Sequence, residues 1–440
     1  MPLKLTKNQI IIISVASAIV LFFILLFVGV IPGIQKSPQK GDFGAGQQTE
    51  INFWGTDPET TIRQLINEYT KVNKSVRIAY REFKEENYEK ELINALAGGK
   101  GPDILMFRNT WLPKHRDKIS PVNETVLNIS QFRQYFPTVA EQDFTLQETS
   151  NEKTVTKIYS FPLYIDTLAL IYNKDVFDAK AVVSPPKTWK EFQGIIPKLR
   201  ELNEFNQLIK PAAAIGGSEK SIDNASDLLS LLMRQFGSEM TDRYKGVSLG
   251  PKGLDAFNFY IQFANASNQY YTWNDNLNNS IDLFSQGTTG IIFNYASKIN
   301  LIKEKNPFIN LGVSLMPQFS SSSQPVNQAN YWGLSVSKQS KNQTLAWNFL
   351  FYLILDQNIS EQYLTISKRP PALRTLIQKY LNDPDLGVFA EQALSARSWP
   401  QQDNNLVKQF FSDMIESVLK GRVSAEKALK FTENELNNIR

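Results

Sequence analysis

Short apolar segments alternate with amphipathic helical segments between residues 50 and 107, and this order constrains the fold more than any other feature of the chain. The predicted strands are 50–54, 76–80 and 104–107, and the apolar periodicity between them predicts two helices. Asp57 and Pro58 predict a helix N-cap followed by proline at the first helical position. Strands joined by helices of this length form right-handed parallel crossovers. The segment therefore predicts an open α/β sheet whose ligand crevice lies at the carboxyl ends of its strands.

A second α/β unit is predicted farther along the chain. Residues 167–172 have the composition of a strand, and Thr188 and Glu191 form a capping box that opens a helix after a Pro-Pro turn. The other predicted strands are 290–293, 312–315 and 334–336, and residues 345–355 form a densely apolar helix. The carboxyl-terminal third is predicted to be mostly helical.

The amino-terminal segment contains an uncharged apolar stretch from Ile10 to Ile31. As a helix this stretch is about 33 Å long, enough to span a bilayer. A signal peptide has a shorter apolar core followed by a small-residue cleavage site, and neither is clear here. Lys4 and Lys7 precede the stretch, so the positive-inside rule predicts cytoplasmic residues 1–9, a transmembrane anchor at 10–31 and an extracytoplasmic body. Residues 32–48 are predicted to form a flexible linker that reaches roughly 20–24 Å.

The composition excludes several classes of protein. The chain has 47 Lys and Arg against 43 Asp and Glu, a formal net charge of +4, without the clustering along the sequence that nucleic-acid binding requires. No cysteine is present, which excludes disulfides, thiolate metal sites and cysteine-linked lipid. The single histidine, His115, lies in a charged stretch and is predicted to be a solvated surface residue rather than a general base.

Several segments, in order, resemble the extracellular solute-binding proteins of family 1, the maltose-binding-like substrate receptors of ABC importers. The phrases that carry the resemblance are Phe53-Trp54-Gly55, the Leu-Ala-Gly-Gly-Lys-Gly-Pro-Asp-Ile run at 96–104, Phe-Pro-Leu-Tyr at 161–164 with Leu-Ile-Tyr-Asn-Lys-Asp at 170–175, Pro-Pro-Lys-Thr-Trp at 185–189, Phe-Ser-Gln-Gly at 284–287 before 290–293, and Trp-Gly-Leu-Ser-Val-Ser-Lys at 332–338. Many Gram-positive relatives carry a lipobox cysteine that this chain lacks, and the polar stretch between Val122 and Lys157 has no assignment.

The resemblance implies a two-lobed periplasmic-binding-protein fold of the α/β class, with hinge crossovers and, in this chain, a preceding transmembrane helix. Each lobe is then discontinuous. The expected amino-terminal lobe combines residues 49–165 with 284–328, and the expected carboxyl-terminal lobe combines residues 166–283 with 329–440.

A sugar has an apolar C–H face and a rim of hydroxyl groups, so its receptor needs aromatic platforms beside amide and carboxylate groups. Trp54 and Trp332 are the first candidates, because a strand end or crossover faces the cleft in the resembled fold. The complete set of candidate ligand-binding residues is Trp54, Asp57, Tyr164, Asp166, Trp273, Asn294, Tyr295, Trp332, Arg369 and Trp399. Core packing or a solvated loop is the alternative for each of them, and Trp189 and Trp347 are assigned to the core.

Three other functions are alternatives to a sugar receptor. The sequence holds no Gly-x-Ser-x-Gly, P-loop or His-Glu-x-x-His motif, and the resemblance favours a receptor over a glycosidase built on two carboxylates. A ferric-ion receptor could use the adjacent phenolates of Tyr270 and Tyr271. A tethered sensor or adhesin could keep the same fold without transport.

The resulting prediction is a membrane-anchored, monomeric receptor that is not an enzyme. It closes on a carbohydrate and delivers it to the permease subunits of an ABC importer, with ligand stabilising the closed state. No cofactor, metal or nucleic-acid partner is predicted. The sequence leaves the identity and size of the sugar open.

Overall fold

The computed structural model describes residues 48–440 except 151–152, 243–245, 321–323 and 440. These residues form one compact unit. The predicted cytoplasmic segment 1–9, the anchor 10–31 and the linker 32–48 lie outside the described residues, except for Gln48. Among the helices in the described ranges, none combines the length and apolar character needed to cross a bilayer.

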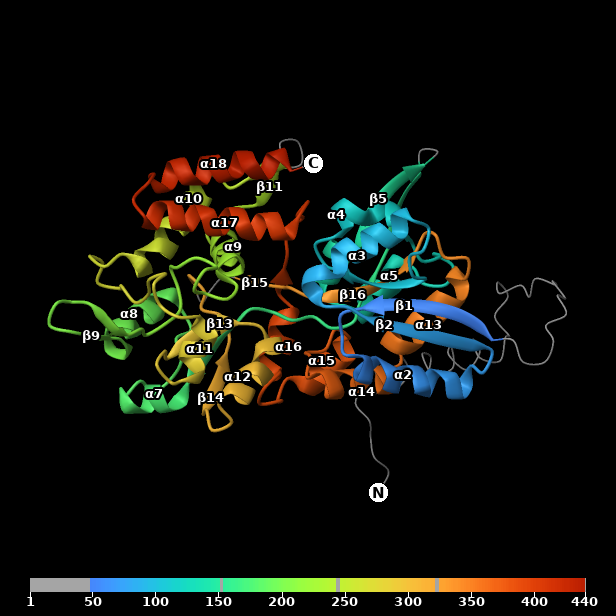
Figure 1. Cartoon of the computed structure of the whole chain (residues 1–440), viewed down its shortest axis with the longest axis horizontal. Helices are drawn as coiled ribbons and strands as arrows, with labels where there is room; N and C mark the ends of the chain where they lie inside the picture. Colours follow the sequence, from blue (N-terminus) through green and yellow to red (C-terminus); the bar gives the residue numbers. More distant parts are fainter. Residues whose placement is uncertain (1–47, 151–152, 243–245, 321–323, 440) are drawn as a thin grey trace, which may run out of the picture. The chain divides into compact units, whose positions relative to one another are not determined.

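A mixed sheet forms the centre of the first lobe (Figure 1), with strand order β2-β1-β3-β16-β4 and β7 paired to β16. The strand β1 is parallel to both β2 and β3, whereas β16 is antiparallel to β3. This arrangement confirms the β-α-β-α-β order predicted from residues 50–107. The strands are β1 (Thr49–Gly55), β2 (Val76–Glu82), β3 (Ile104–Arg108), β4 (Ile119–Ser120), β7 (Phe161–Pro162) and β16 (Trp332–Ser337).

The helix α2 (Glu59–Val72) follows β1 and buries the predicted apolar face, including Ile62 and Leu65. Its N-cap is Pro58, with no side-chain cap bond, so the predicted capping role of Asp57 is wrong. The Glu82 carboxylate instead accepts the Glu59 N–H at 2.7 Å. The other helices of this lobe are α3 (Glu85–Ala97), α4 (Leu112–His115), α5 (Ile129–Tyr135), α6 (Thr138–Phe144), α13 (Gln343–Leu355), α14 (Gln357–Ser367) and α15 (Arg374–Tyr380), with the 3-10 turn η1 (Arg116–Lys118).

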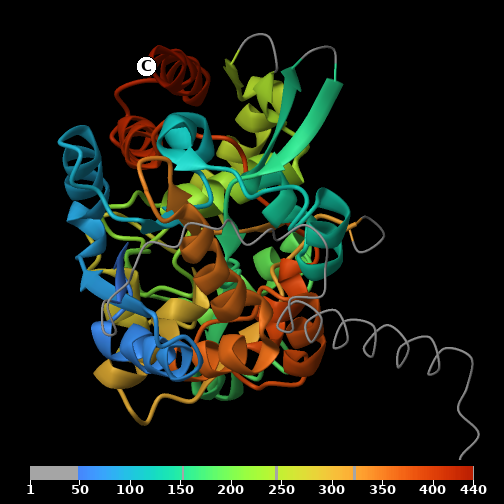
Figure 2. The same cartoon turned by 90° about the vertical axis from the view of Figure 1, so that its right-hand side faces the viewer.

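The polar stretch without a sequence assignment forms α5, α6 and an antiparallel hairpin. The hairpin strands are β5 (Thr145–Ser150) and β6 (Lys153–Ile158), and they project away from the rest of the lobe in Figures 1 and 2. Asn128 opens α5 with a capping box completed by Gln131.

A smaller antiparallel sheet, β13-β8-β14, lies in the second lobe. The helix α8 begins with the predicted capping box between Thr188 and Glu191, which the structure confirms. The strands of this lobe are β8 (Ala169–Asn173), β9 (Glu201–Leu202), β10 (Leu208–Lys210), β11 (Met240–Asp242), β12 (Gly246–Ser248), β13 (Ile291–Asn294) and β14 (Leu311–Ser314). Its helices are α7 (Lys174–Ala179), α8 (Trp189–Leu199), α9 (Ala225–Gln235), α10 (Gly250–Ile261), α11 (Ser280–Ser285), α12 (Ile299–Lys305), α17 (Asn404–Leu419) and α18 (Ala425–Asn438), with 3-10 turns η2 (Gln262–Ala264) and η3 (Ala296–Lys298).

The division into lobes differs from the predicted one. The strands β13 and β14 pair with β8, so residues 284–316 belong with 168–283 and not with the first sheet. The strand β16 pairs with β3, which places residues 329–380 with 49–165. The apolar pattern of a short strand identifies a strand without identifying the sheet it joins, and this is why the prediction was wrong. Hereafter the first lobe is residues 49–165 and 329–380, and the second lobe is residues 168–316 and 399–439.

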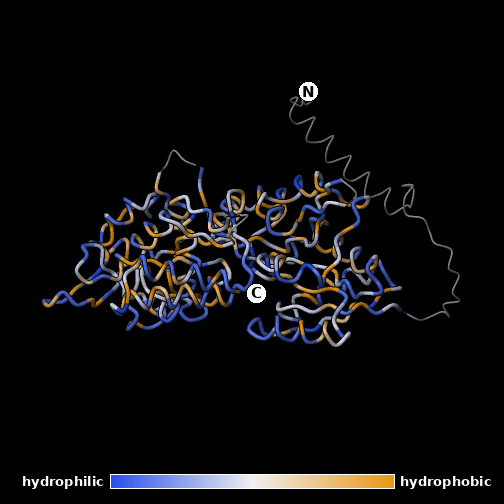
Figure 3. The backbone as a smooth tube through the Cα atoms, turned by 90° about the horizontal axis from the view of Figure 1, so that it is seen from above, coloured by the Kyte–Doolittle hydropathy of each residue, from blue (hydrophilic) through white to orange (hydrophobic). Residues whose placement is uncertain are grey.

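The chain crosses between the lobes near residues 166, 327 and 398. Two short parallel strands, β15 (Asn327–Gln328) and β17 (Ala396–Arg397), pair at the second and third crossings, and α16 (Gly387–Ala393) precedes β17. Each lobe has its own buried apolar cluster, and hydrophobic segments run through both lobes in Figure 3. Trp189 and Trp347 are buried in these clusters, as predicted.

Candidate functional site

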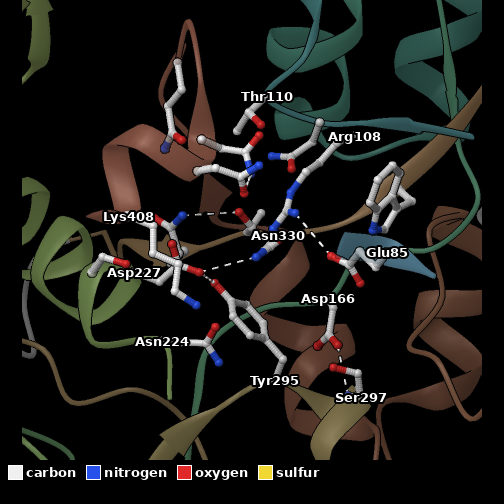
Figure 4. Close-up of a pocket in the computed structure, with 18 of the residues that line it drawn as sticks. Glu85, Arg108, Thr110, Asp166, Asn224, Asp227, Tyr295, Ser297, Asn330 and Lys408 are labelled. Carbon is white, nitrogen blue, oxygen red and sulfur yellow. Dashed lines mark hydrogen bonds and ion pairs between the residues drawn. The ribbon is translucent and has the colours of Figure 1, made fainter. Parts of the chain in front are cut away.

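A cavity of about 800 Å³ lies between the two lobes (Figure 4), within the size range of small-molecule binding sites. The first lobe lines it with residues that follow the carboxyl ends of β2 and β3 and with the start of β16. The second lobe lines it with the first turns of α9 and α17 and with the residues that follow β13. A cavity therefore lies at the carboxyl ends of the parallel strands, where the ligand crevice is predicted.

A chain of hydrogen bonds crosses this cavity from one lobe to the other (Figure 4). Arg108, at the end of β3, donates through Nη1 to Glu85 Oε1 and through Nη2 to Asn330 Oδ1, each at 3.2 Å. Asn330 Nδ2 then donates to Asp227 Oδ2 at 3.3 Å, and the Tyr295 hydroxyl donates to the same oxygen at 2.5 Å. One guanidinium, one amide, two carboxylates and one hydroxyl thus form a continuous row across the cavity. Such a row can exchange its internal hydrogen bonds for bonds to ligand hydroxyl groups.

Asp166 lies in the cavity wall where the chain first crosses between the lobes. Its carboxylate accepts backbone N–H groups from Thr167 at 2.9 Å, Ala296 at 3.0 Å and Ser297 at 3.1 Å. Burial raises the pKa of Asp166 to about 6, against the opposing effect of Arg369 and of these N–H groups. Arg369 Nη1 lies 4.0 Å from Asp166 Oδ2. This carboxylate therefore joins a crossover to backbone of the second lobe.

Aromatic rings and guanidinium groups are paired in the cavity wall. The Arg369 guanidinium carbon lies 4.6 Å from the Tyr164 ring centroid, and that of Arg108 lies 5.6 Å from the Trp332 ring centroid. The exposed fractions of Tyr164 and Trp332 are only 2% and 5%. A ligand can therefore stack on the arginine-covered face of Tyr164 or Trp332 only if the covering arginine moves.

Direct contacts between the lobes lie beside the cavity. Trp111 Nε1 donates to Asn404 Oδ1 at 3.2 Å, and Lys114 Nζ lies 2.5 Å from Asp403 Oδ2 and 2.9 Å from Glu89 Oε1. Burial alone would raise the pKa of Glu89, but hydrogen bonds with His115 and Lys114 lower it to about 2. These contacts join α4 of the first lobe to the start of α17 of the second.

His115 is buried, so its predicted position on the solvated surface is wrong. Its Nε2 lies 2.8 Å from Glu89 Oε1, and its ring contacts the Trp111 ring edge-on at 5.4 Å. The contact with Glu89 of α3, which the local sequence around His115 does not reveal, accounts for this burial.

Five of the ten candidate residues line the cavity: Tyr164, Asp166, Tyr295, Trp332 and Arg369. Three are at or beside a crossover or the start of β16, in agreement with the expectation that crossovers face the cleft. The structure brings together residues from four separate segments of sequence. Whether they contact a ligand stays a prediction.

The other five candidate residues lie outside the cavity lining, and each has protein partners. The Trp54 ring packs against Phe83 at 4.7 Å, and the Asp57 carboxylate accepts the Tyr363 hydroxyl at 2.8 Å. Burial raises the pKa of Asp57. Trp273 is fully buried and donates through Nε1 to the Ser221 hydroxyl at 2.9 Å.

Asn294 and Trp399 complete this second group. Asn294 is fully buried, accepts the side chain of Asn224 at 2.9 Å and donates to Asp223 at 3.1 Å, so it positions two residues that do line the cavity. Trp399 is buried and stacks near Phe411, with 6.5 Å between ring centroids.

Several cavity residues were missed by sequence reasoning. Glu85, Arg108 and Trp111 follow the predicted strands 76–80 and 104–107, so their position after a parallel strand was a usable signal. The others, on α9, α17 and the second crossover, had no local signal: Asn224, Asp227, Asn330, Asn404 and Lys408.

The adjacent tyrosines considered as ferric-ion ligands do not line the cavity. The Tyr271 hydroxyl accepts the Asn274 side chain at 3.0 Å. In the parts of the chain that the structure describes, no group of three or more His, Cys, Asp or Glu residues is arranged to hold a metal ion.

Two α/β lobes, three crossovers and a polar cavity between the lobes define a ligand-binding protein of the hinged two-lobe class. The sequence assigns it more closely, because residues 64–386 match the family model described as bacterial extracellular solute-binding protein. The chain belongs to this family, which confirms the predicted resemblance to extracellular solute-binding proteins. The family consists of solute receptors, and this supports the prediction that the chain is not an enzyme.

Curated relatives span most of the chain at low identity. A maltotriose-binding protein of Pyrococcus abyssi is 22% identical over 354 residues, which cover 79% of this chain and 70% of that protein. A putative binding protein of Brucella abortus is 25% identical over 293 residues, which cover 62% of this chain and 66% of that protein. The chain thus spans about two thirds of the length of these relatives.

Solved structures share the fold. A cyclic alpha-maltosyl-1,6-maltose binding protein from Arthrobacter globiformis has a TM-score of 0.71 at 16% identity, covering 89% of this chain and 99% of its own. The sugar-binding protein MalE of Xanthomonas citri has a TM-score of 0.71 at 18% identity, covering 89% and 97%. These similarities confirm the two-lobed α/β solute-binding fold.

Proposed function

We propose that this chain is the carbohydrate receptor of an ABC importer and that it binds its sugar in the cavity between the lobes. The observation that carries the proposal is the composition of this cavity. Carboxylates, amides and cationic donors from both lobes surround a space of about 800 Å³, and Trp332, Tyr164 and Tyr295 lie in its wall. Neutral oligosaccharides need this combination of hydrogen-bonding groups and aromatic surface.

The relatives support the same class of ligand. Similar proteins include a maltotriose-binding protein, a cyclic alpha-maltosyl-1,6-maltose binding protein and a cyclo/maltodextrin-binding protein in complex with maltotetraose. A sugar that bridges the lobes would contact Arg108 and Trp332 on one side and Asp227 on the other. Because such a ligand binds the closed arrangement better than an open one, it shifts the population toward closure.

Membrane attachment and delivery complete the proposal. The uncharged stretch 10–31 anchors the receptor in the membrane as a single span, with the body extracytoplasmic. The sugar-bound receptor, a monomer, then delivers its ligand to the permease subunits in the same membrane. Detection of full-length chain in membranes after high-salt and alkaline washes, with the body accessible to protease from outside, tests this part of the proposal.

Sugar binding is tested on residues 48–440, which form one compact unit. A thermal-shift screen compares maltotriose, mannobiose, tagatose, a polyamine and ferric citrate, because a ligand that binds only the folded protein raises its Tm. A Tm rise with one sugar class, confirmed by calorimetry, is the expected result. A Tm rise only with ferric citrate would contradict the proposal and favour the ferric-receptor alternative. The absence of a Tm rise with every compound, in a sample that unfolds cooperatively, would contradict it and favour the sensor alternative.

A further inference from the structure

A row of exposed lysines lies along the edge of the first-lobe sheet that is farthest from the cavity. The parallel strands β1, β2 and β3 begin at this edge, and the antiparallel strand β16 ends there. Lys74 precedes β2, Lys100 precedes β3, and Lys338 and Lys341 follow β16. All four side chains are exposed. We call these four residues the lysine edge.

Backbone and amide hydrogen bonds hold the segments of the lysine edge side by side. Gln48 Nε2 donates to the carbonyl of Lys74 at 2.8 Å, next to the start of β1. Gln339 Nε2 donates to the carbonyl of Leu96 at 2.8 Å and ties the end of β16 to the turn before Lys100. The four lysines therefore occupy neighbouring loops of one sheet edge, although they are far apart in the sequence.

The positive charge of the lysine edge is not balanced by nearby acids. No ion pair joins any of its four lysines to another described residue, whereas three other basic side chains of this region do have acidic partners: Lys71 with Glu68, Arg77 with Glu50 and Lys118 with Asp117. Asp103 also lies at this edge; it forms no ion pair with a described residue and accepts the Asn52 N–H at 2.9 Å and the Ser340 hydroxyl at 2.5 Å, so its negative charge offsets one of the four lysines. The edge thus presents excess cationic charge to whatever lies within a Debye length, about 8–10 Å.

The position of the lysine edge along the chain indicates that a membrane surface faces it. The strand β1 begins at Thr49, in the middle of this edge, and the residues before it in the sequence include the uncharged stretch 10–31 and the predicted linker. With the proposed anchor in the membrane, a linker of that composition would tether the start of β1, and with it the lysine edge, within a reach of roughly 20–24 Å. The cavity lies at the opposite ends of the same strands, so contact at this edge leaves the cavity accessible to solute.

We infer that the lysine edge binds the anionic lipid headgroups of the membrane that holds the anchor. The inference rests on the membrane attachment proposed above. Juxtamembrane lysines contribute about fivefold each to the affinity for an anionic bilayer at moderate ionic strength. Four of them on one edge fix the resting orientation of the body, which a linker alone leaves free.

The test uses residues 48–440, so that membrane insertion of the anchor has no part in the result. Cosedimentation compares vesicles of phosphatidylcholine with vesicles that also contain phosphatidylglycerol. The test variant is K74Q/K100Q/K338Q/K341Q. The matched control is K187Q/K190Q/K198Q/K430Q, which removes the same charge from four exposed lysines of the second lobe that have no ion pair with any described residue.

The unsubstituted protein is expected to bind only the anionic vesicles and to dissociate in about 1 M salt, where the Debye length falls to about 3 Å. The test variant is expected to lose more than about tenfold in partitioning, and the control variant to retain it. Absence of binding to anionic vesicles, or an equal loss in the control, overturns the inference. Sugar affinity measured without vesicles separates the two proposals, because a lysine-edge variant that still binds sugar normally leaves the receptor function intact.

Discussion

Replacing Trp332 with alanine tests the proposed sugar platform, and the structure predicts two separate effects. The first concerns stability. The indole is 5% exposed and contacts the rings of Trp111 and Tyr88 at 5.1 and 5.8 Å between centroids. Removing a tryptophan from such a packed position costs about 3–5 kcal/mol in the free energy of unfolding. We therefore expect the Tm of the Trp332→Ala variant to fall by several degrees.

The second effect of Trp332→Ala concerns sugar affinity. Stacking on an aromatic ring contributes about 1–3 kcal/mol for nucleic-acid bases, and we apply this range to a sugar face. In the empty receptor the Arg108 guanidinium covers the same ring, and displacing it from the ring costs about 0.5–1 kcal/mol. With the middle of each range, the expected net loss on substitution is about 1.3 kcal/mol, a roughly eightfold weaker Kd.

Isothermal titration calorimetry, performed well below the Tm of every variant, separates the two effects. The matched control is Trp54→Ala, because Trp54 is in the same lobe but packs on Phe83 outside the cavity. We expect Trp54→Ala to bind sugar as the unsubstituted protein does. An unchanged Kd for Trp332→Ala, or an equal loss in both variants, would refute the assignment of Trp332 as a platform.

Three further substitutions test other parts of the structure. Asp403→Asn keeps the side-chain oxygen that caps α17 but removes the charge facing Lys114. Because a partly exposed ion pair contributes about 0.2–1 kcal/mol, we expect a more open unliganded form by small-angle X-ray scattering and sugar binding weaker by up to about fivefold. Burial raises the pKa of Asp143 to about 6, above its unfolded value, so folding favours the protonated form. Its contribution to stability is therefore present below about pH 4 and is lost, by up to about 3 kcal/mol, as the pH rises through 6. Urea unfolding of the unsubstituted protein should show this slope together with the one expected from Asp166, whose pKa burial also raises to about 6, and Asp143→Asn should lose about half of the combined slope. Gly333→Ala places a Cβ 2.5 Å from the Phe161 carbonyl oxygen, and we expect a loss of at least about 1–3 kcal/mol in the same assay.

The local elements were predictable because their signals are local. The apolar periodicity between residues 50 and 107 depends on one sheet and the helices that cover it, and the Thr188 capping box is complete within four residues. The lobe that contains residues 291–294 was not predictable in the same way. A strand of four buried residues fits either sheet, and only its hydrogen bonds with 169–173 decide between them.

The candidate site was predictable to the extent that topology fixes it. Tyr164, Asp166 and Trp332 adjoin crossovers or a strand end, and all three line the cavity. Trp273 had the same aromatic signal but is fully buried, because aromatic character alone does not distinguish a platform from a core residue. Asp227 had no signal, since its position on the first turn of a helix acquires meaning only when that helix lies opposite β3.

The lysine edge was likewise not predictable from the distribution of charge along the sequence. The lysines of the lysine edge are spread from residue 74 to residue 341, and the sequence therefore shows no basic cluster. The mixed sheet brings them together because an antiparallel strand ends where parallel strands begin. A function that depends on such a patch is invisible to charge patterning along the chain and requires the strand order.

The first crossover offers a physical link between the proposed ligand binding and rotation of the lobes. Asp166 lies at this crossover, accepts N–H groups from Ala296 and Ser297 of the second lobe, and lies 4.0 Å from Arg369 Nη1, which follows α14 of the first lobe. Any rotation of one lobe about the crossovers changes the distance between these charges while the hydrogen bonds to backbone keep the carboxylate fixed. In the proposed receptor, a ligand that contacts Arg369 would act on the same electrostatic contact that responds to rotation, and we therefore expect it to have different affinities for the open and closed states.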